Sequence, residues 1–149
     1  MKKLLLMKFL PANPDVALLV LRITAMLSLF IKHGIEKGFT FSAMVPHFVD
    51  PIGIGLGPSL FIAMIGDFVC SFLMVIGLCT RWAALFCFTN IMVAWVLVHH
   101  FAYFGKTSMA GHGELIVAYL SVTLTLFVSG AGRYSVDNLI LDRSSARIA

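Results

Sequence analysis

Ionisable side chains lie inside long apolar stretches of this sequence, where a charge is costly unless it is paired or wetted. Arg22 and Asp67 are the deepest of them. At about 1.5 Å of helix rise per residue, their expected depths differ by roughly 8 Å, which a long guanidinium side chain can span. We therefore predict a buried Arg22–Asp67 ion pair. The alternative is that Arg22 extends to the membrane interface while Asp67 is protonated or bonds to a hydroxyl.

A second group of polar side chains lies where three apolar stretches end. His33 and Lys37 follow the first stretch, His99 ends the third, and Glu114 begins the fourth. Such imidazole, ammonium and carboxylate groups could bind a quinone headgroup, relay protons or hold a metal. We predict no metal site, because no H-E-x-x-H spacing occurs and the adjacent His99 and His100 would point about 100° apart on a helix. The remaining alternative is that these four are ordinary interfacial residues.

Four apolar stretches must position these side chains. Each is long enough to cross a hydrocarbon core of about 30 Å as a helix, and the periodicity is helical rather than alternating. The sequence therefore predicts an all-α, integral membrane four-helix bundle that forms a single domain over residues 1–149. The predicted spans are Val16–His33, Pro58–Cys79, Trp82–Phe101 and Glu114–Ala131, with an outer loop over residues 38–57.

The composition supports a membrane location. Hydrophobic residues make up 60% and charged residues 12% of the 149 residues, which excludes an ordinary soluble domain. The net charge of +4 is explained by membrane orientation, so no nucleic-acid partner is predicted. Cys70, Cys79 and Cys87 form no C-x-x-C pair, which disfavours a disulfide relay within this chain.

The distribution of basic residues predicts that both termini are cytoplasmic. Basic residues are enriched on the cytoplasmic side of membrane proteins. With the N-terminus inside, seven basic residues are cytoplasmic and three are outside; with Arg22 in a span, these complete the 11 of the chain. The inner seven are Lys2, Lys3, Lys8, Arg81, Arg133, Arg143 and Arg147, and the outer three are Lys32, Lys37 and Lys106.

Short segments near these residues resemble the DoxX family of small four-helix membrane proteins. The resemblance runs from about Ala17 to about Leu141, and Asp67 stands where many members have Glu. The matching segments are His33-Gly34 with Lys37, Asp50–Gly55, Gly77–Arg81, Met92–Ala94 with His99, Gly113-Glu114, and Gly130–Asp137.

The resemblance implies a role in redox chemistry. The family includes membrane subunits of thiosulfate:quinone oxidoreductase and members of oxidative and thiol stress assemblies, while a eukaryotic relative resembles an assembly chaperone. We accordingly expect an accessory subunit of a quinone-linked redox system in the bacterial inner membrane, with quinone as cofactor. We expect its partners to be the lipid bilayer and either a membrane or periplasmic protein or a second copy of the chain. A non-catalytic scaffold or assembly factor, and a proton or small-solute path, are the alternatives.

Overall fold

The structure is a computed structural model that describes residues 12–101 and 113–145. Every regular element within these ranges is helical, which confirms the predicted all-α class. Several basic residues used to predict orientation lie outside the described residues, namely Lys2, Lys3, Lys8, Lys106 and Arg147.

The first long helix covers Pro14–Phe39 and is longer than predicted. It begins at Asn13, whose side chain accepts a hydrogen bond of 3.1 Å from the Val16 N–H and so caps the helix. The helix continues past its predicted end at His33, which places Lys37 on the helix. Its segments are α2 (Pro14–Leu21), η1 (Arg22–Met26), α3 (Leu27–Leu29), η2 (Phe30–Gly34) and α4 (Ile35–Phe39).

The second and third long helices meet at a tight turn. The second ends at Ile76, three residues before the predicted Cys79, because Gly77 adopts a left-handed conformation with φ +74° that glycine readily takes. The third ends at Val98, three residues before the predicted Phe101. The second consists of α6 (Leu56–Met64), η4 (Ile65–Cys70) and α7 (Ser71–Ile76), and the third of α8 (Thr80–Val93) and η5 (Ala94–Val98).

Three of the described helices are long and apolar enough to cross a membrane, and a fourth apolar helix, α9 (Gly113–Ser129), has 17 described residues. The chain is therefore a multi-pass membrane protein. The predicted outer loop contains two short helices, α5 (Phe41–Met44) and η3 (Val45–His47), and α10 (Val136–Ser145) follows α9.

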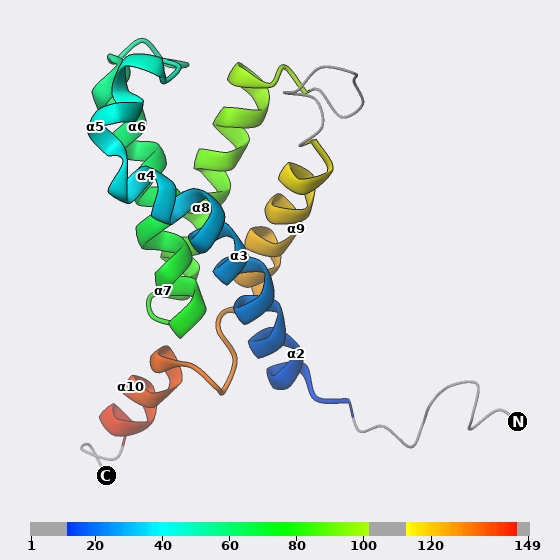
Figure 1. The fold of residues 1–149 in the computed structure, drawn as a ribbon. Helices are drawn as coiled ribbons and strands as arrows, with labels where there is room; N and C mark the ends of the chain where they lie inside the picture. Colours follow the sequence, from blue (N-terminus) through cyan, green and yellow to red (C-terminus); the bar gives the residue numbers. More distant parts are fainter. Residues whose placement is uncertain (1–11, 102–112, 146–149) are drawn as a thin grey trace, which may run out of the picture.

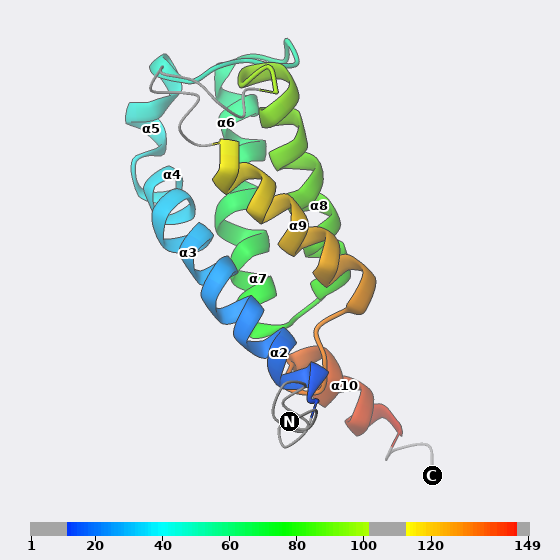
Figure 2. The same ribbon diagram turned by 90° about the vertical axis from the view of Figure 1, so that its right-hand side faces the viewer.

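The described ends of the chain lie at the same end of the bundle. The start of α2 and all of α10 lie at the bottom, and α5 lies at the top (Figures 1 and 2). This arrangement is what the predicted cytoplasmic termini require, and the side of the membrane that each end faces stays a prediction. We call the end with α10 the inner end and the end with α5 the outer end.

The core is narrow and the outer surface is largely apolar. One face of the first helix is buried through Met26 and Leu29, which are three residues apart and so lie on the same face. Large apolar side chains such as Phe39, Trp82 and Val128 are exposed, with exposed fractions of 81%, 77% and 68%. A surface this apolar suits a lipid environment.

Candidate functional site

Three helices place polar side chains together near the middle of the second and third helices. The Lys37 Nζ lies 2.8 Å from the Asp67 Oδ2, and the two side chains are only 14% and 12% exposed. From the third helix, the Asn90 Nδ2 donates to the Asp67 Oδ1 at 3.4 Å. Asp67 is therefore bonded by side chains from the helices on both sides of it.

Two glycines allow this close approach. A Cβ on Gly34 would collide with the backbone carbonyl oxygen of Asp67 and lie 2.9 Å from the Cα of Phe68, so the first and second helices touch at their backbones. A Cβ on Gly66 would lie 2.6 Å from the Asn90 Nδ2. Because Gly34 and Gly66 have no side chains, the helices approach closely enough for Lys37 and Asn90 to bond to Asp67.

The polar group lines one wall of a cavity of about 380 Å³. This volume lies within the range of about 300–1,000 Å³ that is usual for small-molecule sites. Most of the wall is apolar and comes from the second, third and fourth helices and from residues 48–52. The polar residues that line it are His33, Lys37, Ser59, Asp67, Asn90, His99 and Tyr119.

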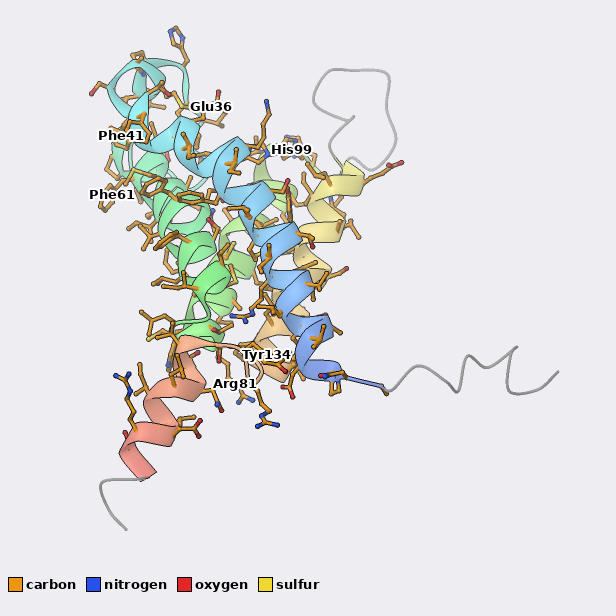
Figure 3. The ribbon with its side chains drawn as sticks, turned by 60° about the horizontal axis from the view of Figure 1, so that its bottom comes forward. Glu36, Phe41, Phe61, Arg81, His99 and Tyr134 are labelled. Carbon is orange, nitrogen blue, oxygen red and sulfur yellow. The ribbon has the colours of Figure 1, made fainter. Side chains whose placement is uncertain are left out.

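His99 supplies a polar atom that no described residue satisfies. Its Nδ1 is buried and has no hydrogen-bond partner within residues 12–101 and 113–145. Figure 3 places His99 near the same end of the bundle as Glu36. Because buried polar atoms are nearly always paired, this nitrogen is available to a ligand or a water in the cavity.

The structure brings together three of the four predicted headgroup residues. His33, Lys37 and His99 line the cavity. Glu114 is exposed at the start of α9 and is not among the lining residues. Asn90 was missed, although a primary amide within an apolar stretch is itself a signal of an intramembrane site.

The predicted Arg22–Asp67 ion pair is wrong. Asp67 pairs with Lys37, and the Arg22 Nη2 donates to the Tyr134 backbone carbonyl. The backbone of Asp67 lies against Gly34, twelve residues beyond Arg22, which is about 18 Å of helix rise. The depth estimate failed because the first helix is longer than predicted and carries Lys37 to the level of Asp67.

Arg22 belongs to a separate group of residues at the inner end, because it bonds to Tyr134. Figure 3 labels Tyr134 and Arg81 at this end. There the carboxylate of Asp137 accepts hydrogen bonds from the backbone N–H groups of Cys79 at 2.7 Å and Thr80 at 3.0 Å, which caps the start of α8. The hydrogen bonds that Arg22 and Asp137 make are to backbone atoms, while the Arg22 Nε and Nη1 are buried with no partner among the described residues. We therefore assign a structural role to the inner group.

The described residues do not suggest a metal centre. Within residues 12–101 and 113–145, no group of three or more His, Cys, Asp or Glu side chains is arranged to hold a metal ion. The chemistry of the cavity is therefore that of an ion pair, an amide and two imidazoles beside an apolar wall.

Comparison with known proteins agrees with this architecture. Residues 17–100 match the family described as DoxX. An uncharacterised protein of Haemophilus influenzae is 31% identical over 114 residues, which cover 74% of this chain and 81% of the relative. No solved structure matches. Because the family match covers more than half of the chain, this protein belongs to the DoxX family.

Proposed function

We propose that the protein binds a quinone headgroup in the outer cavity and acts as an accessory subunit of a quinone-linked redox system in a bacterial inner membrane. The observation that carries the proposal is the Lys37–Asp67 ion pair in the wall of a mostly apolar cavity. A charged group within the membrane costs free energy, so its presence there is a reason to infer a function.

The cavity matches the chemistry of a quinone. The ring is apolar and needs hydrogen-bond donors for its two carbonyl oxygens. Lys37 has further N–H donors beyond the one given to Asp67, and His33 and His99 can each donate from a ring nitrogen. Reduction of a quinone to a quinol takes two electrons and two protons. In this proposal an electron-donating partner subunit supplies the electrons, and the imidazoles and Lys37 transfer protons.

The test compares residues that line the cavity with matched residues that do not. We expect His33→Ala and Lys37→Gln to weaken quinone binding about tenfold, the effect of losing about 1.4 kcal/mol of hydrogen bonding. Lys32→Gln and Glu114→Gln are the controls, because both residues are exposed and neither lines the cavity. Binding is measured by titration of the purified protein in lipid nanodiscs and by mass spectrometry of quinone retained from native membranes.

The alternative functions predict different results. Co-purification with one partner in fixed ratio, with no quinone bound by the wild-type protein, would support a scaffold or assembly factor. Proton flux in liposomes that is lost in Asp67→Asn would support a proton path. Equal quinone binding by the cavity variants and by the controls would reject the proposed headgroup site.

A further inference from the structure

A second cavity lies beside the candidate headgroup site, at the surface of the bundle. It has a volume of about 520 Å³. Four residues line both cavities: Ile52, Ile62, Asn90 and Val93. The polar cavity and the apolar groove outside it are therefore neighbours, with only these side chains between them.

The groove is almost entirely apolar and runs along α8. From Trp82 to Val93 it follows eleven residues, or about 16 Å of helix rise, which is roughly half the hydrocarbon thickness of a bilayer. Its walls include side chains that are exposed to the outside, such as Leu85 and Phe86. The Thr89 hydroxyl is already satisfied, because it donates to the Leu85 carbonyl at 2.9 Å.

Asn90 marks the boundary between polar and apolar surroundings. It lines both cavities, and its side chain bonds to Asp67 within the headgroup site. A molecule with a polar head beside Asn90 and a tail in the groove would satisfy both environments. A free headgroup would occupy only the first cavity.

We infer that the groove holds the long isoprenoid tail of the quinone, so that the ligand enters sideways from the bilayer between α6 and α8. The inference rests on the proposed headgroup site. It adds that the ligand class is a long-tailed, membrane-dissolved quinone. Small water-soluble quinones would bind the same headgroup site without using the groove.

The test blocks the groove while leaving the headgroup site intact. Thr89→Phe places a ring within the groove at a residue that does not line the headgroup cavity. Thr125→Phe is a matched control on α9, since Thr125 is also exposed, donates to the carbonyl four residues earlier and lines neither cavity. The probes are a benzoquinone without a tail and the same ring with a decyl tail, both titrated into nanodiscs. Quinone concentrations are expressed per lipid, so that partitioning of the tailed quinone into the bilayer does not count as binding.

We expect Thr89→Phe to weaken binding of the decyl quinone about tenfold and to leave the tailless quinone unchanged, which also shows that the variant is folded. Thr125→Phe should change neither. Three outcomes would overturn the groove inference alone. The decyl tail could add nothing to the affinity for the quinone, or Thr89→Phe could leave the affinity for the decyl quinone unchanged. Thr89→Phe could also remove a co-purified phospholipid while quinone binding stays the same. Failure of both probes to bind the wild-type protein would reject the proposed headgroup site as well.

Discussion

The outer and inner ends of the bundle each hold buried charged residues, and they differ in what those residues bond. In the cavity that reaches the outer-end residues 48–52, Lys37 and Asn90 each bond to the Asp67 side chain. At the inner end Arg22 bonds to a backbone carbonyl and Asp137 bonds to backbone N–H groups. Neither inner residue lines either cavity.

The difference separates two uses of a buried charge. Bonds to backbone atoms fix the chain where helices begin, end or turn. Bonds between side chains beside an apolar cavity can rearrange when a ligand arrives. Changes at the inner end should therefore reduce stability, whereas changes at the outer end should alter ligand binding as well.

The largest effect is expected from Gly77→Ala at the inner end. Gly77 has φ +74°, and an added Cβ would collide with the Arg22 guanidinium and lie 2.6 Å from the Ser135 Cβ. Backbone strain and overpacking together should lower the free energy of unfolding by about 3 kcal/mol. Unfolding in mixed micelles measures the change. Gly57→Ala is the control, since an added Cβ there meets no atom within 4 Å, and equal stability of the two variants would contradict the predicted steric conflict.

The next largest effect is expected from separating Lys37 and Asp67. Lys37→Met or Asp67→Leu should each cost about 2 kcal/mol of stability, because each leaves a partly buried charge unpaired. The double variant should recover part of this loss while still failing to bind quinone. A double-mutant cycle on the free energy of unfolding measures the coupling.

The same cycle with Arg22 tests whether the two ends are independent. Arg22→Met combined with Asp67→Leu should give additive losses within about 0.5 kcal/mol, as expected for residues far apart with no shared partner. Strong coupling between Arg22 and Asp67 would support the ion pair predicted from the sequence and would contradict the distinction between the two ends.

A smaller effect is expected from Asp137→Ala. The carboxylate accepts from the backbone N–H groups of Cys79 and Thr80, so its loss should cost about 1 kcal/mol, as for other helix caps. Quinone binding should not change. Asp142→Ala is the control, because Asp142 is exposed and bonds to the Asn138 side chain within α10. The stability of Asp142→Ala should stay within about 0.5 kcal/mol of the wild type. A loss of quinone binding in Asp137→Ala would show that the two ends of the bundle are not independent.

The sequence predicted the helices well because long apolar stretches with helical periodicity have few other structures in a membrane. The all-α class followed from that periodicity. Helix ends were less predictable. Gly77 ends the second helix early, and nothing in the apolar pattern required the first helix to continue to Phe39.

The site was predicted only in part, because residue spacing gives the faces of helices but not their relative heights. His33, Lys37 and His99 were predicted to lie together, and they do line one cavity. The pairing of Lys37 with Asp67 depends on how the helices cross, which Gly34 determines through a backbone contact. Arg22 was assigned the wrong partner because its acceptor, the Tyr134 carbonyl, is a backbone atom that any residue type would provide.

The smallest effect is expected at Asp50, an outer-end carboxylate that bonds to backbone N–H groups, as Asp137 does, and in addition to one side chain. It accepts from the Ser59 hydroxyl at 2.7 Å and from the backbone N–H groups of Gly55 at 2.7 Å and Ile54 at 3.1 Å. These bonds lower the pKa of the Asp50 carboxyl below its ordinary value, and the bond from Ser59 is the largest cause. If the type of partner decides the role of a charge, Asp50 should contribute to the turn before α6 and not to ligand binding.

The pH dependence tests this expectation. Because the pKa of Asp50 is lower in the folded protein, its contribution to stability is present above the ordinary pKa of about 4 and is lost as pH falls through the lowered pKa. Ser59→Ala removes the largest cause, so the pKa of Asp50 should rise and the turn should open at a higher pH. Carboxyl ¹³C NMR of Asp50 measures the first change, and amide exchange at Ile54 and Gly55 measures the second, with Ser144→Ala on α10 as the control. An unchanged pKa of Asp50 in Ser59→Ala would show that the Ser59 bond does not lower it, and unchanged amide exchange at Ile54 and Gly55 would show that this bond does not hold the turn.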